Sequence, residues 1–334
     1  MSIGTRTAAK GLEGVRAGLS GRVLVTGGAG FIGSHIAEAY LAAGWDVTVL
    51  DDLSRGKEKN VPRCARLVRA DIRSPEARRT LVEGRFDVLN HHAAQIDVRV
   101  SVDQPALDAD INLVGFVNLL EGASKGGVKR VVFASSGGVV YGETTVFPTP
   151  ETDGKRPVSP YGVSKLAGEH YLRALSLLRG FEGVAMRYSN VFGPRQDPKS
   201  EAGVVSIFVS RVLAGRPMTV FGDGTQTRDY VFVRDVARAN VLAGGAAVAA
   251  GDGIDATAFN IATGRERTVL AVAAAVIQVI GRTVPIEFAP ARPGELLRSV
   301  LDTRKAEERL GWRPEHRFED GLTELVTWFR EEAS

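Results

Sequence analysis

Short apolar runs alternate with longer amphipathic stretches through the first half of the chain. The apolar runs predict buried strands, and the stretches between them carry apolar residues at helical spacing. The predicted strands are Val23–Thr26, Val47–Leu50, Arg66–Arg69, Val88–His91, Arg130–Ala134 and Gly183–Tyr188, and the clearest helices are Phe31–Leu41, Asp108–Lys125 and Tyr161–Leu178. Strands that alternate with helices indicate an α/β fold in which a doubly wound parallel sheet is covered on both faces.

The regular alternation fades after about residue 189, where Gly, Pro and Arg clusters separate shorter elements. A chain of 334 residues is long enough for roughly two domains. We therefore expect a lead-in over residues 1–20, a sheet domain over 21–188, and a smaller C-terminal lobe over 189–334. Late elements of the sheet domain are expected to be interleaved with that lobe.

Composition narrows the class of protein. Hydrophobic residues make up 44% and charged residues 24% of the chain, as in globular proteins, and no apolar run is long enough to predict a membrane span. Residues 1–20 lack the apolar centre of a secretory signal, and Cys64 is the only cysteine, so we expect a cytoplasmic protein. The pI is about 9.0, but the net charge is only +3 and no basic stripe is present. Neither nucleic acid nor a membrane is expected as a partner.

A glycine-rich turn follows the strand Val23–Thr26 and opens the helix Phe31–Leu41. Its spacing is Gly-x-x-Gly-x-x-Gly, and the strand–turn–helix context is typical of a dinucleotide-binding fingerprint. Gly27 permits the tight turn, Gly30 lets the backbone approach a diphosphate, and Gly33 permits close packing of the helix on the strand. The N-terminus of the helix then faces the phosphate charge.

Asp51 follows the second predicted strand and lies 18 residues after Gly33. This is close to the spacing of about 20 residues at which a carboxylate binds the ribose of a dinucleotide. A carboxylate accepts hydrogen bonds from a 2′-hydroxyl and repels a 2′-phosphate, so the sequence favours NAD over NADP. Arg55 lies nearby and could weaken that preference.

Tyr161 and Lys165 are four residues apart, so they share one face of a helix. A lysine ammonium favours the phenolate form of tyrosine, and lowering a pKa of about 10 by three units needs roughly 4 kcal/mol. Lys165 and a positively charged nicotinamide ring can supply this, which makes Tyr161 a candidate base. Ser135 and Ser136 follow a predicted strand and bring hydroxyls to the same crevice. The open alternative is that Tyr-x-x-x-Lys, a common pattern, lies on an ordinary surface helix.

A long ordered series of motifs resembles the extended short-chain dehydrogenase/reductases, and within them the UDP-glucose 4-epimerase family of UDP-sugar 4-epimerases. The resemblance runs from about Arg22 to Phe329. The motifs that carry it are Thr26–Gly33, Asp51–Ser54, Asp71–Ile72, His92–Gln95, Ser159–Lys165, Arg187–Gln196, Phe221–Gly224, Arg228–Tyr230 and Arg292–Glu295.

This resemblance implies a Rossmann-like NAD-binding domain, a UDP-sugar-binding lobe and an isomerase that passes through a transient 4-keto sugar. It implies Ser136, Tyr161 and Lys165 as catalytic residues. In the loop after the strand Arg130–Ala134, however, Ser136 lies one residue further from Tyr141 than the hydroxyl residue usually does in the family. Ser135 therefore stays open as a substitute. The residues implied to bind the cofactor are Gly27, Gly30, Phe31, Ile32, Gly33, Asp51, Asp52, Asp71, Ile72, Ala93, Ala94, Gln95, Asn112, Tyr161 and Lys165.

The same resemblance implies a set of substrate-binding residues. These are Ser136, Asn190, Arg228, Arg292, Glu295 and Ser299, with the two arginines at the diphosphate and Glu295 at the uridine ribose. Ser299 stands where the family lines the sugar pocket, and a small residue there leaves room for a 2-acetamido group. We therefore expect activity on UDP-N-acetylglucosamine as well as on UDP-glucose.

Several alternatives remain at this point. Nucleotide-sugar dehydratases and UDP-glucuronate decarboxylases carry an acid after the loop hydroxyl, where this chain has Gly137 and Gly138, which disfavours both. A UDP-glucuronate 4-epimerase stays open, and so does a sensor that binds NAD without catalysis.

No metal is expected. The resemblance implies a homodimer formed through the helices Asp108–Lys125 and Tyr161–Leu178.

Overall fold

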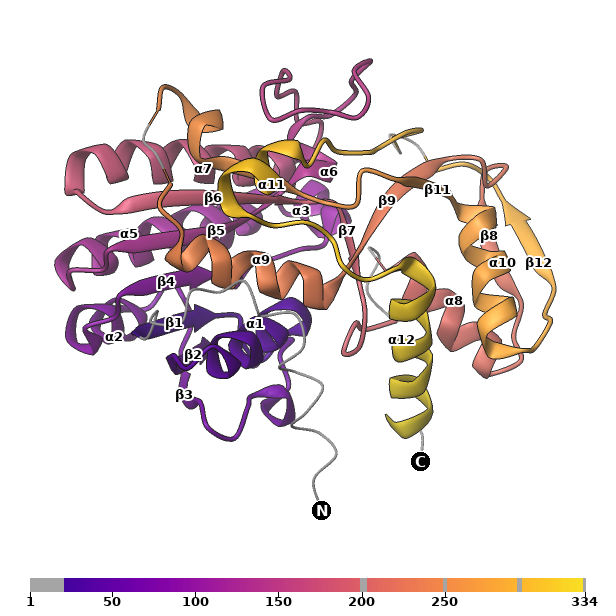
Figure 1. Cartoon of the computed structure of the whole chain (residues 1–334), viewed down its shortest axis with the longest axis horizontal. Coiled ribbons are helices and arrows are strands. Elements are labelled where there is room, and N and C mark those ends of the chain that lie inside the picture. The colour runs from indigo at the N-terminus through magenta and orange to yellow at the C-terminus, as the bar shows by residue number, and fades with distance from the viewer. Residues whose placement is uncertain (1–20, 199–202, 249–250, 293–295, 333–334) are drawn as a thin grey trace.

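A seven-stranded parallel sheet organises the larger part of the molecule (Figure 1). The computed structural model describes residues 21–198, 203–248, 251–292 and 296–332. The spatial order of the strands is β10–β6–β5–β4–β1–β2–β3. Their bounds are β1 Arg22–Thr26, β2 Asp46–Asp51, β3 Arg66–Arg69, β4 Val88–His91, β5 Arg130–Ser136, β6 Glu182–Tyr188 and β10 Ala258–Ile261. The chain order reverses between β1 and β4, and sheets of this kind bind ligands beyond the carboxyl ends of their strands at that point.

Helices cover both faces of this sheet (Figure 1). One face packs against α1 Phe31–Ala42, α9 Val233–Gly245 and α11 Arg304–Leu310, and the other against α2 Pro75–Gly84, α5 Gly115–Lys125 and α7 Pro160–Arg179. Because both faces are covered, the strands are apolar on both sides. This accounts for their continuous apolar sequences.

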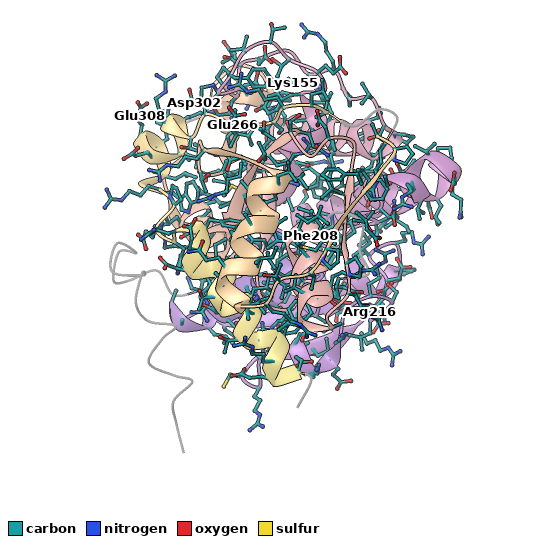
Figure 2. All side chains as sticks on the ribbon, turned by 90° about the vertical axis from the view of Figure 1, so that its right-hand side faces the viewer. Lys155, Phe208, Arg216, Glu266, Asp302 and Glu308 are labelled. Atoms are coloured by element: carbon teal, nitrogen blue, oxygen red, sulfur yellow. The ribbon has the colours of Figure 1, made fainter. Side chains whose placement is uncertain are left out.

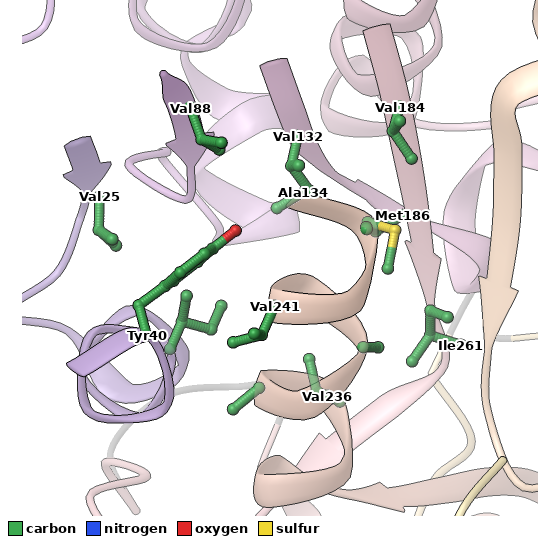
Figure 3. Packing of buried hydrophobic residues seen from close by; sticks show 14 of the residues in the cluster. Val25, Tyr40, Val88, Val132, Ala134, Val184, Met186, Val236, Val241 and Ile261 are labelled. Atoms are coloured by element: carbon green, nitrogen blue, oxygen red, sulfur yellow. The ribbon is translucent and has the colours of Figure 1, made fainter. Parts of the chain in front are cut away.

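Tyr40 shows how the first helical layer closes on the sheet (Figure 3). Its ring extends from α1 into the space between Val25 and Val241, over the strands that carry Val88 and Val132. The buried hydroxyl donates to the carbonyl of Asn240 at 3.0 Å, so it retains a hydrogen bond away from water. The side-chain amide of Asn90 also donates to this hydroxyl at 3.3 Å, so the apolar packing of the layer includes a small polar contact.

The C-terminal lobe has its own core, in which Phe208 is buried (Figure 2). Helices α8 Val204–Leu213, α10 Val269–Ile280 and α12 Phe318–Glu332 surround this core. Two small sheets complete it: β8 Met218–Phe221 with β12 Ile286–Ala289, and β11 Glu266–Thr268 with β9 Thr227–Phe232 and β7 Asn190–Phe192. Shorter pieces are η1 Glu58–Asn60, α3 Val98–Asp103, α4 Pro105–Ala109, η2 Asp110–Val114, α6 Gly137–Val140 and η3 Ile254–Thr257.

The doubly wound sheet and all six predicted strands are confirmed, with ends that differ by at most two residues. The helical stretch predicted over Asp108–Lys125 is confirmed, and within it η2 is a π-helical turn that joins α4 to α5 without a break. In this turn the amide of Asn112 bonds both main-chain groups of Gln95, and periodicity alone does not show such a contact. Among the described residues, no helix is both long and apolar enough to cross a membrane.

Candidate active site

The glycine turn between β1 and α1 is too tight for side chains. Gly27 has a φ of +68°, and a Cβ there would lie 2.6 Å from the amide nitrogen of Ala93. A Cβ on Gly33 would lie 2.2 Å from the carbonyl oxygen of Gly27, so the helix can approach the turn only if residue 33 is glycine. No side chain caps α1, whose first turn contains Phe31 and Ile32. This uncapped N-terminus beside a glycine cradle fits the diphosphate of NAD.

Asp51 lies at the end of β2 and is hydrogen-bonded to that turn. Its carboxylate accepts from the amides of Ala29 at 3.0 Å and Leu53 at 2.9 Å, and it is almost wholly buried. Burial raises the pKa of Asp51, and the two amide hydrogen bonds oppose this rise. Asp52 is exposed and caps Ser54 instead. Of the two acids, only Asp51 is built into the turn.

The other residues expected at the cofactor come together at the ends of β1, β3 and β4. Ala93 donates its amide to the hydroxyl of Thr26 at 3.3 Å, and Ala94 and Gln95 follow it toward the π-helical turn. Asp71 forms an ion pair with Arg73, which lowers the pKa of the Asp71 carboxyl. Ile72 is buried against Gly115. These positions therefore surround one edge of the sheet.

Tyr161 and Lys165 project from the first two turns of α7. The hydroxyl of Ser159 accepts from the amide of Gly162 at 3.2 Å and caps the helix. The Nζ atom of Lys165 lies 5.7 Å from the centroid of the Tyr161 ring and donates to the carbonyl of Ala134 at 2.8 Å. The helix is thus joined to the end of β5, and the two candidate catalytic side chains are held on the face that meets the sheet.

The electrostatic environment of this pair has two components. Burial raises the pKa of Tyr161, and the carboxylate of Asp108 raises it further. Burial lowers the pKa of Lys165 to about 8, while Asp108 acts in the opposite direction. The protein by itself therefore favours the neutral phenol. The predicted lowering of the Tyr161 pKa stays a prediction for the enzyme with NAD bound.

The two adjacent serines at the end of β5 have different environments. Ser135 is buried and donates its hydroxyl to the carboxylate of Glu169 at 2.5 Å. Ser136 is partly exposed and has extended backbone, so its side chain points to the opposite side. A Cβ on Gly138 would meet only the hydroxyl of Ser136, at 3.9 Å, whereas one on Gly137 would lie 2.4 Å from Leu301. A side chain at position 138 would therefore have space beside Ser136, whereas one at position 137 would have to displace the buried Leu301.

Three buried charged residues near this site were missed in the sequence. Arg187 is fully buried and pairs with Glu169 at 2.6 Å, and Asp108 is buried beside Ser164. Glu169 had one available signal, because it lies four residues after Lys165 and so continues the face of α7 that carries Tyr161. A lone arginine in a strand, or an aspartate near a helix start, has no such signal.

Apart from Ser136, the residues expected at the substrate come from the part of the chain after residue 188. Asn190 begins β7 and pairs with Tyr230 of β9, the strand that carries Arg228. The Arg292 guanidinium stacks 3.9 Å above the centroid of the Phe221 ring and is exposed. Ser299 is 9% exposed, and Glu295 lies outside the described residues. Among the described residues, no group of three or more His, Cys, Asp or Glu side chains is arranged to hold a metal ion.

Comparison with known proteins agrees with this geometry. Residues 23–262 match the NAD dependent epimerase/dehydratase family. The chain is 45% identical to a UDP-glucose 4-epimerase of Mycolicibacterium smegmatis, over 92% of this chain and 98% of that one. The solved UDP-glucose 4-epimerase of Thermotoga maritima with UDP-glucose is 43% identical, with a TM-score of 0.89 and coverage of 94% and 100%.

A UDP-N-acetylglucosamine 4-epimerase of Methanobrevibacter ruminantium, solved in complex with UDP-N-acetylmuramic acid, is 32% identical. Its TM-score is 0.87, and the match covers 94% of this chain and 99% of that one. The family match covers the sheet domain together with β7, β8 and β9, and so includes the glycine turn and both candidate catalytic segments. The chain belongs to the NAD dependent epimerase/dehydratase family.

Proposed function

We propose that this protein is a UDP-sugar 4-epimerase that interconverts UDP-glucose and UDP-galactose and uses NAD as its cofactor. The observation that carries the proposal is the position of Tyr161 and Lys165 at the end of β5, on the edge of the sheet that holds the glycine turn. The similarity to the UDP-glucose 4-epimerases of M. smegmatis and T. maritima supports it.

In this proposal each catalytic residue has a distinct task. When bound, NAD would supply the acceptor and donor for a hydride at C4 of the sugar, which allows the hydride to return to the opposite face. Tyr161 takes the proton of the 4-hydroxyl and later returns it, and Ser136 hydrogen-bonds the same oxygen. Lys165 holds the nicotinamide ribose and stabilises the Tyr161 phenolate by its charge. The ammonium of Lys165 has protons left for that ribose, because a lysine carries three donors and the Ala134 carbonyl takes one.

Cofactor and substrate are proposed to lie on opposite sides of the crevice. The glycine turn and Asp51 hold the diphosphate and ribose of NAD. Arg228 and Arg292 bind the diphosphate of the substrate, since guanidinium binds phosphate in bidentate fashion. Asn190 and Glu295 are proposed to contact the UDP-sugar as well.

The small residue Ser299 supports a second substrate class. Its side chain is nearly buried, so its size limits the space around it. We include UDP-N-acetylglucosamine among the substrates on this ground, and the relative from M. ruminantium is named for that activity. UDP-glucuronate is retained as the alternative sugar to test.

We also propose a homodimer, with one change from the expected surface. Exposed apolar side chains lie on α3, α4, η2 and α7, whereas the apolar side chains Phe116, Leu119 and Leu120 of α5 are buried. The proposed face contains Val102, Leu107, Val114, Val163 and Tyr171. A second copy would cover these side chains. Sedimentation at micromolar concentration would show a dimer, and Val163→Glu should shift it to monomer.

A cytoplasmic location is likewise proposed, from the single cysteine.

Proton NMR with UDP-glucose and UDP-N-acetylglucosamine in separate tubes, without added NAD, tests the activity. Formation of the galacto epimer in both tubes supports a dual-specificity epimerase that retains its cofactor. Conversion of UDP-glucose alone keeps the mechanism and rejects the argument from Ser299. No conversion of these sugars or of UDP-glucuronate, even with added NAD, would overturn the proposal and favour a non-catalytic NAD sensor.

A further inference from the structure

Asp108 is a fully buried residue of α4, and its carboxylate lies against α7. One oxygen accepts from the hydroxyl of Ser164 at 2.6 Å. The other accepts from the side-chain amides of Gln95 at 3.0 Å and Asn112 at 2.9 Å. All three donors are neutral, and no ion pair within 4.0 Å joins Asp108 to Lys165. A buried carboxylate is costly unless a positive charge in the same low-dielectric region compensates it.

Lys165 is the opposite charge in this region. It directly follows Ser164 in α7, is 5% exposed, and donates to the neutral carbonyl of Ala134. Two buried charges of opposite sign, each bonded to neutral partners, stabilise one another through space. The effect appears in both members of the catalytic pair, because Asp108 raises the pKa of Lys165 and that of Tyr161.

The other titratable groups near Lys165 leave no unmatched charge beside it, because two are histidines whose pKa values are lowered and the third is a carboxylate with its own ion-pair partner. His91 and His92, at the end of β4, both have pKa values lowered by burial and by Lys165, that of His92 to about 3. Glu169, one turn further along α7, is paired with Arg187. Asp108 is therefore the carboxylate whose charge is not already matched by a direct partner.

We propose that Asp108 is a positioning residue that keeps Lys165 protonated in the interior and, through Ser164, Gln95 and Asn112, fixes α7 against the π-helical turn. This rests on the proposed roles of Tyr161 and Lys165 in proton transfer. The cost of the arrangement is that the same negative charge opposes formation of the Tyr161 phenolate. Asp108 thus moves both ends of the active pH range in the same direction.

Asp108→Asn isolates the charge, because an asparagine can keep all three hydrogen bonds. Its oxygen accepts from Gln95 and Asn112, and its amide donates to the hydroxyl of Ser164, which both donates and accepts. In the pH profile of kcat, the acid limb reflects the ionisation of Tyr161, and the alkaline limb reflects the loss of the proton from Lys165. We expect both limbs to move to lower pH, by roughly one unit. Ser164→Ala is the matched control, since it removes one hydrogen bond and keeps the charge, and its limbs should stay in place.

A second readout needs no turnover. Ultraviolet difference titration of each enzyme against its Tyr161→Phe counterpart follows the phenolate of Tyr161 alone. Its midpoint should be lower in Asp108→Asn than in the wild type and unchanged in Ser164→Ala. If Asp108→Asn does not fold, Asp108→Ser removes the same charge and serves in its place. Unmoved limbs and an unmoved midpoint would overturn the proposal. If the wild type has no epimerase activity, the proposed function is rejected instead, and the titration still decides the role of Asp108.

Discussion

The hydroxyl of Ser135 donates to the carboxylate of Glu169, and this bond separates the roles of two adjacent serines. Glu169 is paired in turn with the fully buried Arg187, so the carboxylate is fixed on two sides. Ser135 is therefore part of the packing between β5 and α7. Ser136, on the opposite side of the strand, is half-buried, and we propose that its hydroxyl faces the substrate.

Ser136→Ala should lower kcat by about a hundredfold and leave the fold intact, because it removes one donor to the reacting oxygen. Ser135→Ala should instead lower the free energy of unfolding by about 1–3 kcal/mol, since it leaves a buried carboxylate with one hydrogen bond fewer. Steady-state kinetics and urea unfolding of both variants check this. A larger loss of kcat in Ser135→Ala than in Ser136→Ala would show that the roles are reversed.

Gly33→Ala should abolish retention of NAD. A Cβ at this position would lie 2.2 Å from the carbonyl of Gly27, so the turn must open and the amides at the start of α1 must move. NAD content is measured by releasing the cofactor from the purified protein and determining its absorbance.

The matched control is Gly44→Ala, at the end of the same helix. Gly44 has a φ of +84° with open space around it, so alanine there should cost only about 1–2 kcal/mol of backbone strain. The control should keep its NAD. Equal NAD content in Gly33→Ala and the wild type would show that the turn does not bind the cofactor as proposed.

Ser299→Tyr should remove activity on UDP-N-acetylglucosamine while activity on UDP-glucose persists. The side chain at position 299 is 9% exposed, so a large ring there has to displace its neighbours or enter the space that we propose for the sugar. We expect kcat/KM for the N-acetylated sugar to fall at least about tenfold more than for UDP-glucose, comparable to other steric pocket effects. Ser299→Ala, which keeps the pocket open, should leave the ratio unchanged. Equal losses on both sugars would contradict the assignment of Ser299 to the pocket.

His316 should make stability depend on pH. Its Nδ1 lies 3.0 Å from the buried carboxylate of Asp235, and this hydrogen bond raises the pKa of His316. A group whose folded pKa lies above its unfolded value of about 6.5 stabilises the fold fully below that pH. Its contribution is then lost as the pH rises through the raised folded value.

His316→Gln should therefore lower the free energy of unfolding at about pH 6 and do so less at about pH 9. The difference between the two should be at most about 1 kcal/mol, because the ring is partly exposed and water screens the pair. Urea unfolding at both pH values measures it, with His170→Gln on the exposed side of α7 as the control. A destabilisation that is the same at both values would contradict a charged His316.

Local sequence patterns were sufficient to predict the parallel sheet, the family and the cofactor of this protein. The strands that lead to Gly27 and Asp51 are continuous apolar runs, and such runs predict a parallel sheet covered on both faces. The family and the NAD cofactor were also predicted, since motifs such as Thr26–Gly33 are contiguous segments of the chain, and both predictions are confirmed by the family match. Individual site roles, among them those of Ser136 and Ser299, stay predictions.

Only the tertiary structure decided which residues come together around the active site. Asp108 and Ser164 are 56 residues apart, and Ser135 and Glu169 are 34 apart, so no local periodicity connects either pair. Asn112 in the π-helical turn likewise bonds Gln95, which lies 17 residues earlier in the segment after β4. Secondary structure follows from spacing along the chain, which is local. The charge around Tyr161 depends on which helices pack against α7, because burial strengthens electrostatic interactions only among groups that the fold brings together.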